Sequence, residues 1–526
     1  MLPPNLQTPR EVTLYYNTVY NDLIESGQAI PFIYPWAGVG AFAVIGYLLI
    51  DHRRYPWTRY VVYSFLVAFQ VWCIRTTRAV HPAAAFGVGL LSGWGLLWVF
   101  ALMVAKDCQT DFKRLERRSI GAGDGGQVAT NGAIVIDDVS ITHKSSPSTS
   151  EQKYSDGNGE LCWQPYPSDL SARIDWIADA FCSFRGVGWN FQTSGVPRLP
   201  KQIEAKLHSN VDSRTEPEIF TASRTGIRRF ASRPQLLRLC IRDLILGYFI
   251  LDIVKTLMAR DRYFIGYTTS PAPTYLPTIL QHSHILTKSY RLLLSLAGIY
   301  FALREIFTLG PLFFSFIVGP GYIGLRGETW MNPPDMFGSF GSILDKGLAG
   351  WWGGWWHQVF RFGFEAPTDM LLRGLGVEKK SQTGKLIGLF TAFFLSGCLH
   401  ACGSYTQLGY TYPLRGPFTF FMLQPFGILA QLLASQLLKQ AGISPAIPSS
   451  VRRAANFAIV HIWLYYTAPL LMDDFAAGGV WLYEPLILSP LRALGFGAKD
   501  DRFFCWWNGI AWWRSGRTWW DTGIAL

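Results

Sequence analysis

Long apolar stretches recur along this chain, and they constrain its fold more than any other feature. The clearest is KLIGLFTAFFLSGCLHACGSY, residues 385–405, which is long enough to cross the hydrocarbon core of a bilayer as a helix. Similar runs occupy residues 31–50, 59–73, 83–105, 236–258, 290–307, 310–325, 418–438 and 454–471, with a weaker one at 480–494. Glycine-proline pairs leave open whether 290–325 forms two short helices or one bent helix. We therefore expect an all-α, polytopic transmembrane helical bundle.

The composition agrees with a membrane protein. Of the 526 residues, 49% are hydrophobic and only 16% are charged, and the 21 Trp, 23 Tyr and 36 Phe suit interfacial belts and an apolar tunnel. The net charge of +11 suits cytoplasmic loops facing a lipid bilayer, or an anionic cofactor. It comes with no nucleic-acid-binding motif, so we expect no nucleic acid partner. The eight cysteines form neither a disulfide framework nor a CxxC pair, and we expect them to be reduced.

Changes in composition divide the chain into three parts. Residues 1–105 are expected to hold N-terminal transmembrane helices, 106–235 a cytosolic loop, and 236–526 a second membrane region. Arg53, Arg54 and Arg59 follow the first apolar run and place that turn in the cytosol, although Arg75 and Arg78 oppose this orientation. The aromatic C-terminal tail is interpreted as an anchor at the membrane interface.

The predicted cytosolic loop has distinct segments. Residues 119–160 are rich in Gly, Ser, Thr and Asp, so we expect a disordered, dispensable linker, and the GAGDGG within it lacks the context of a nucleotide site. HSNVD (His208 to Asp212) is interpreted as an accidental HxxxD match. Apolar spacing predicts an interfacial helix near 169–183. RGVGWNF (Arg185 to Phe191) is expected to form a turn that docks on the membrane region or, alternatively, a surface loop.

His400 is the first candidate functional residue. It lies near the end of the 385–405 run, where an ionisable group is costly and usually functional. Ser396, His400 and Ser404 share one line of the predicted helix. An imidazole in such apolar surroundings is expected to be neutral and able to accept a proton, as a general base must. The alternative is a histidine that only bonds a carbonyl of a neighbouring helix.

His357 is the second candidate. It lies in WMNPPDMFGSFGSILDKGLAGWWGGWWHQVFR, residues 330–361, where prolines and glycines predict irregular backbone that lines protein or a cavity. His357 and Arg361 are expected to share a helix face at i, i+4 beside a wall of tryptophans, which suits the mouth of a ligand site. Arg361, with Trp356 and Gln358 beside it, is the candidate for holding an anionic part of a cofactor. The alternative is an interfacial Trp/Arg anchor with an incidental histidine.

These residues carry a resemblance to a known family. The pattern W-x-x-x-W-H-x-x-x-R, followed by a histidine deep in an apolar helix, resembles the membrane-bound O-acyltransferase superfamily and its wax-synthase-like branch. RGVGWNF and RGPFTFF (Arg415 to Phe421) are similar to fungal members that acylate terpenoid-type alcohols. The resemblance is most specific over residues 330–421.

The resemblance implies a function and a set of roles. His400 corresponds to the catalytic histidine and His357 to its polar partner, in a multi-pass enzyme of the endoplasmic reticulum that acts in secondary-metabolite biosynthesis. Acyl-CoA, with acetyl-CoA first, would be the co-substrate, a hydrophobic alcohol the acceptor, and no cofactor would be permanently bound. Cys398 and Cys402 lie about 200° around the helix from His400, so no metal site is expected there. A long-chain wax or sterol ester synthase and a transporter are the alternatives.

Overall fold

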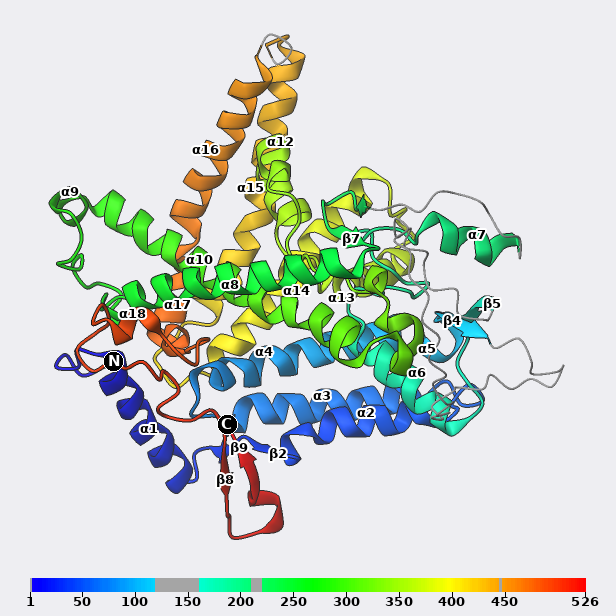
Figure 1. Ribbon diagram of the computed structural model, residues 1–526, viewed down its shortest axis with the longest axis horizontal. Helices are drawn as coiled ribbons and strands as arrows, with labels where there is room; N and C mark the ends of the chain where they lie inside the picture. Colours follow the sequence, from blue (N-terminus) through cyan, green and yellow to red (C-terminus); the bar gives the residue numbers. More distant parts are fainter. Residues whose placement is uncertain (1, 119–159, 210–219, 444–446) are drawn as a thin grey trace, which may run out of the picture.

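The computed structural model describes residues 2–118, 160–209, 220–443 and 447–526, which form a mainly helical protein (Figure 1). Within these ranges, four helical segments are long and apolar enough to cross a membrane, or five if one bent pair counts as a span. They are α4 with the π-helical turn after it (Pro82–Ala105), α10 with its π-helical turn (His284–Val318), α14 (Gln382–Tyr405), α15 with the turn before it (Leu414–Gln440), and the bent pair α16 (Ser449–Thr467) and α17 (Pro469–Gly478). The prediction of a mainly helical membrane protein is confirmed at this level.

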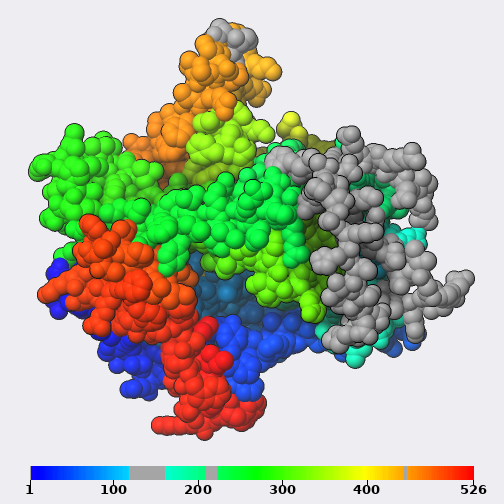
Figure 2. Space-filling model, in the orientation of Figure 1, coloured from blue at the N-terminus to red at the C-terminus, as the bar shows by residue number. Residues whose placement is uncertain are grey.

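The other helices surround these spans or connect them. The longer ones are α1 (Pro9–Glu25), α2 (Val39–Leu49), α3 (Thr58–Thr76), α6 (Leu170–Cys182), α7 (Lys201–Ser209), α8 (Arg233–Ala259), α12 (Gly341–Gly350) and α13 (Arg361–Gly374). The short ones are α5 (Cys108–Asp111), α9 (Thr278–His282), α11 (Pro320–Ile323) and α18 (Pro490–Ala493). Figure 2 shows that the hairpin of α15 and α16 projects beyond the rest of the molecule.

Short strands form four small sheets among the described residues. The strands are β1 (Ile30–Pro31), β2 (Ile33–Tyr34), β3 (Thr77–Arg78), β4 (Arg114–Arg118), β5 (Glu160–Gln164), β6 (Phe220–Ala222), β7 (Arg228–Phe230), β8 (Trp512–Arg514) and β9 (Gly523–Ala525). β1 pairs in parallel with β3, while the pairs β4–β5 and β6–β7 and the three-stranded order β2-β9-β8 are antiparallel. The aromatic tail, interpreted as a membrane anchor, is therefore paired through β9 with β2 near the N-terminus.

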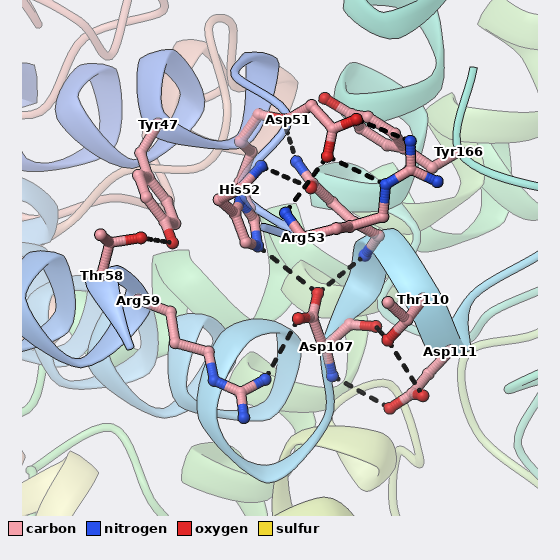
Figure 3. A network of polar contacts seen from close by, with 12 residues as sticks. Tyr47, Asp51, His52, Arg53, Thr58, Arg59, Asp107, Thr110, Asp111 and Tyr166 are labelled. Carbon is pink, nitrogen blue, oxygen red and sulfur yellow. Dashed lines mark hydrogen bonds and ion pairs between the residues drawn. The ribbon is translucent and has the colours of Figure 1, made fainter. Parts of the chain in front are cut away.

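The N-terminal helices alternate in direction. Pairing of β1 with β3 brings residues 30–31 beside 77–78 at one end. At the opposite end the Asp107 carboxylate contacts His52 Nε2 at 3.5 Å and Arg59 Nη1 at 3.1 Å (Figure 3). The turn after α2 and the segment after α4, both expected in the cytosol, thus lie side by side. The expected 31–50 span was wrong in length, because β1 and β2 occupy residues 30–31 and 33–34 and α2 begins only at Val39.

Two expectations for the second half are settled by the structure. One long helical segment, His284–Val318, covers most of the apolar stretch 290–325, which therefore does not form two short spans. The apolar run at 480–494 is not a span, since it contains a short 3₁₀ turn and α18. This segment is tied to α8: Lys255 Nζ donates to the carbonyl oxygens of Trp481 and Tyr483 at 2.6 and 2.7 Å, and Asp252 accepts from the backbone of Leu491 at 3.0 Å.

Helix α14 is held close to α4. A Cβ at Gly89 would lie 1.9 Å from the carbonyl oxygen of Cys402, so the two backbones approach as only a glycine permits. Thr406 Oγ1 donates to the carbonyl of Ala85 at 2.7 Å and accepts from the backbone N–H of Gly89 at 3.0 Å. These contacts fix the C-terminal end of α14, which carries His400.

The described part of 106–235 is folded against the second membrane region. Arg114, only 1% exposed, pairs with Asp175 at 2.7 Å and with Asp179 at 3.4 Å, and Arg326 also pairs with Asp175 at 2.7 Å. A helix lies at the position predicted near 169–183, namely α6 (Leu170–Cys182). Its buried side includes Trp176 and Ile177, while Leu170 and Ile174 are exposed.

The low-complexity segment lies almost wholly outside the described residues. Of the predicted disordered stretch 119–160, only Glu160 is described, and it begins β5. GAGDGG also lies outside the described residues, as do positions 210–212 of the HSNVD match. The interpretations of these three segments stay predictions.

Candidate active site

His400 has a defined hydrogen-bonding state in α14. Its Nδ1 lies 2.9 Å from the carbonyl oxygen of Ser396, one turn earlier. A carbonyl oxygen can only accept, so Nδ1 carries the hydrogen, and in the neutral form of the ring the lone pair is therefore on Nε2. The ring is partly buried and packs on Phe421 at a centroid distance of 4.3 Å. The expected alternative, a bond to a neighbouring helix, is replaced by a bond within α14, which leaves Nε2 for chemistry.

His357 lies outside any helix. The π-helical turn Trp351–Trp355 ends where Trp356 adopts extended backbone (φ −60°, ψ 149°), and α13 begins at Arg361. The expectation that His357 and Arg361 share a helix face is therefore wrong. The run of glycines and tryptophans before His357 does not maintain a regular α-helix, so the spacing of residues 357 and 361 carries no helical meaning.

The predicted cofactor-binding residues stabilise this break. Gln358 Nε2 donates to the carbonyl oxygens of Trp352 and Trp356, both at 2.8 Å, and so satisfies groups that the end of the helical turn leaves free. Arg361 Nε bonds Glu365 Oε1 at 2.6 Å, and its Nη1 donates to Gln358 Oε1 at 3.2 Å. Arg361 thus holds Gln358 rather than His357.

The imidazole of His357 is surrounded by aromatic rings. Trp356, Phe360 and Phe337 lie 5.3, 5.5 and 6.2 Å from it by ring centroids. Burial, followed by the positive charge that His400 would carry if protonated, lowers the pKa of His357, so the ring is neutral. Among the described residues, its buried Nδ1 has no hydrogen-bond partner. The structure therefore brings the two predicted histidines into one neighbourhood.

Trp352 connects the surroundings of the two histidines. Its ring lies 6.1 Å from Trp356, which contacts His357, and 6.0 Å from Phe421, which packs on His400. Phe393 is 5.4 Å away on the same helix as His400. Sequence reasoning identified the tryptophan wall but missed the part played by Phe421. A hydrophobic residue in an apolar span carries no signal of its own, so its contact with His400 needed the structure.

Outside the candidate spans, Arg185 and Arg228 hold the segment that leads to Phe337 beside His357. Arg185 donates from Nη1 and Nη2 to the carbonyl oxygens of Asp335 and Pro333, both at 3.0 Å, and burial lowers its pKa to about 10. The Asp335 carboxylate accepts from Arg228 Nε at 2.7 Å and from its Nη2 at 2.6 Å. Two residues further on, Phe337 contacts His357. The RGVGWNF turn is thus bound through Arg185 to residues 333 and 335 and is not a free surface loop.

Metal binding is the other chemistry that histidines and cysteines can support. In the part of the chain that the structure describes, no group of three or more His, Cys, Asp or Glu side chains is placed to hold a metal ion. Cys398 and Cys402 are free and partly buried on α14. The groups that the site presents for chemistry are the two imidazoles and their aromatic surroundings.

Comparison with known proteins gives a family match over this segment. Residues 333–423, which contain both histidines, match the membrane bound O-acyl transferase family. The chain is 24% identical to an O-mevalon transferase of Penicillium terrestre over 64% of this chain and 67% of that protein. It is 22% identical to an O-mevalon transferase of Aspergillus niger over 57% of this chain and 61% of that one. It is 30% identical to an acetyltransferase of Hericium erinaceus over 27% and 35% of the two chains. The matches thus span from about a third to two thirds of these relatives, and no solved structure matches the chain.

Proposed function

We propose, from the match of residues 333–423 to the membrane bound O-acyl transferase family, that the chain transfers an acetyl group from acetyl-CoA to a hydroxyl of a hydrophobic, terpenoid-like alcohol. The observation that carries this proposal is the state of His400, whose Nδ1–H is held by the carbonyl of Ser396 and whose Nε2 is free to accept a proton. His357, a second neutral imidazole close by, supports it. The acetyltransferase names of several relatives motivate the choice of acyl group.

The proposed mechanism uses direct attack without an acyl-enzyme. His400 Nε2 removes the proton of the substrate hydroxyl while the oxygen attacks the thioester carbonyl carbon. His357 orients a reactant or stabilises the oxyanion that develops on that carbonyl. The tetrahedral intermediate then collapses, the carbon–sulfur bond breaks, and His400 returns the proton to the leaving thiolate. The products are the acetyl ester and CoA, and the enzyme ends in its starting state.

The donor is proposed to bind beside the break at residues 356–361. Trp356 presents an aromatic face, and Arg361 is a cation whose guanidinium is bonded through Nε and Nη1. Arginine next to aromatic rings suits contacts with phosphate groups. Gln358 contributes by holding the backbone of Trp352 and Trp356 in place.

We further propose a multi-pass protein of the endoplasmic reticulum that acts in fungal secondary-metabolite biosynthesis. The candidate spans and the names of the fungal relatives support this setting. Two relatives are named O-mevalon transferases, so the acyl group is the part of the proposal that needs the most direct test.

The experiment uses membranes that contain the whole chain. Acetyl-, butyryl- and oleoyl-CoA are each supplied with farnesol or ergosterol, and both CoA release and ester formation are measured by mass spectrometry. Acetyl ester formation that needs the chain and is lost in His400→Ala supports the proposal. Selective use of oleoyl-CoA would instead identify a long-chain ester synthase. Absence of CoA release with every donor, together with uptake of a labelled alcohol into vesicles, would identify a transporter. Comparing metabolites of a host with and without the chain then identifies the natural alcohol.

A further inference from the structure

Gln424 is a fully buried polar residue in the apolar helix α15 (Thr419–Gln440). Its Oε1 accepts two indole N–H groups, from Trp352 at 3.3 Å and from Trp463 at 3.1 Å. Its Nε2 donates to the carbonyl oxygen of Phe420 at 2.9 Å. A carbonyl oxygen has two lone pairs, so these two indoles use its full capacity to accept. One side chain therefore joins the π-helical turn before His357, helix α15 and helix α16.

The contact with Trp352 matters because of where that ring lies. On one side Trp352 neighbours Phe421, whose ring packs on His400, and on the other it neighbours Trp356, whose ring contacts His357. A shift of the Trp352 indole would be passed to both sets of rings, because packed interiors leave no free volume to absorb it.

The backbone at Gln424 also needs support. Pro425 follows inside the helix and has no N–H, so the carbonyl of Phe421 lacks its normal donor within the helix. The bond from the Gln424 side chain to the carbonyl of Phe420 strengthens the helix one residue before the gap. The backbone that carries the ring packed on His400 is thus stabilised by the same amide.

We propose that Gln424 is a positioning residue for acyl transfer: it holds Trp352 between the aromatic neighbours of His357 and His400 and so sets the separation of the two imidazoles. This proposal rests on the function proposed above. Gln424 touches neither histidine, so it acts through Trp352 and Phe421 only. Its loss should slow the chemical step far more than it weakens the binding of the acyl donor, whose phosphate groups are proposed to contact Arg361.

A purely structural role would run through Trp463 instead. That ring packs on α15 at Gly427, where a Cβ would lie 2.4 Å from Trp463 Cε2, and it anchors α16 to α15. If this anchoring were the whole function of Gln424, Trp463→Phe would reproduce the effect of losing Gln424, and Trp352→Phe would not.

Gln431 provides a matched control on the same helix. Its Oε1 accepts from the backbone N–H of Leu348 at 2.8 Å, and its Nε2 donates to Asn456 Oδ1 at 2.9 Å. It therefore also joins α15 to two other elements, α12 and α16, through both ends of its amide. None of these partners belongs to the rings around the histidines.

The test compares Gln424→Met, Trp352→Phe, their double variant, Trp463→Phe and Gln431→Met in the full-length protein. Each is purified in detergent, its thermal midpoint is recorded, and kcat and KM for acetyl-CoA are measured with the alcohol that the unchanged protein acetylates fastest. We expect Gln424→Met and Trp352→Phe each to lower kcat about 10- to 100-fold, with KM changed less than about twofold. The double variant should be no worse than the more damaging single one, because both remove the same bond.

The outcomes separate the two proposals. Failure of the unchanged protein to form any acetyl ester would refute the proposed function. An active protein in which Gln424→Met keeps its kcat, or in which Trp463→Phe and Gln431→Met are as slow as Gln424→Met, would refute the role of Gln424 alone. Should Gln424→Met fail to fold, Trp352→Phe decides the question, since it removes the same hydrogen bond and keeps an aromatic ring.

Discussion

Replacing His400 with Asn tests the proposed base most directly. The amide nitrogen of Asn takes the place of Nδ1 and keeps a donor for the carbonyl of Ser396, while the atom corresponding to Nε2 is removed. The hydrogen bond that would be lost in Ala is worth about 1 kcal/mol, so Asn should fold nearly as well as His. The general base is worth about 10²- to 10⁴-fold in rate, or about 3 to 5 kcal/mol of barrier. We expect kcat to fall by that factor at an almost unchanged thermal midpoint.

His461 offers a matched control for this substitution. Its Nδ1 lies 2.7 Å from the carbonyl oxygen of Phe457, also one turn earlier in its helix, and its ring packs on that phenylalanine at 3.9 Å. His461→Asn therefore makes the same chemical change in the same local geometry. The assay is transfer of labelled acetyl from acetyl-CoA to the alcohol. If His400→Asn kept more than about a tenth of the wild-type kcat, or if His461→Asn were equally slow, the assignment of His400 as base would be wrong.

Two further substitutions test the supports of the site. Asp335→Asn removes the charge from the bridge to Arg228 and should lower stability by about 1 kcal/mol, because that guanidinium is a third exposed, and thermal unfolding in detergent measures it. Gly89→Ala would place a methyl group 1.9 Å from the carbonyl of Cys402, so we expect a loss of about 3 kcal/mol or failure to accumulate. Gly95→Ala, with nothing within 4 Å, is its control and should accumulate normally; equal levels of the two variants would contradict the close contact of α4 and α14.

The sequence predicted the helical membrane class and both histidines because those signals are local. A long apolar run specifies a buried or spanning helix whatever packs against it, and an ionisable residue inside such a run is conspicuous. The resemblance to membrane-bound O-acyltransferases, based on residues 330–421, is confirmed by the family match over 333–423. The same local reasoning could have drawn attention to Gln424, a polar amide within the apolar stretch at the start of α15.

The errors arose where long-range contacts override local pattern. Residues 31–34 are apolar enough to begin a span, yet β1 and β2 pair with segments that are distant in the sequence. In α6, Leu170, Ile174 and Ile177 all recur at helical spacing, but of these three only Ile177 is covered by neighbouring elements, together with Trp176. The ring of Phe421 on His400 and the clamp of Arg185 on Asp335 likewise depend on contacts that no sequence spacing reveals.

The break in the helix before α13 explains how a neutral histidine and an arginine coexist four residues apart. On a continuous helix Arg361 would be a direct neighbour of His357, and the charged guanidinium would lie close to the imidazole. With the break, the guanidinium turns to Glu365 at 2.6 Å and to Gln358 at 3.2 Å, while His357 lies among Trp356, Phe360 and Phe337. Buried irregular backbone is costly unless its polar groups are satisfied, and the Gln358 amide satisfies two of them. The departure from helical geometry is thus the feature that separates a permanent charge from the ring next to the proposed base.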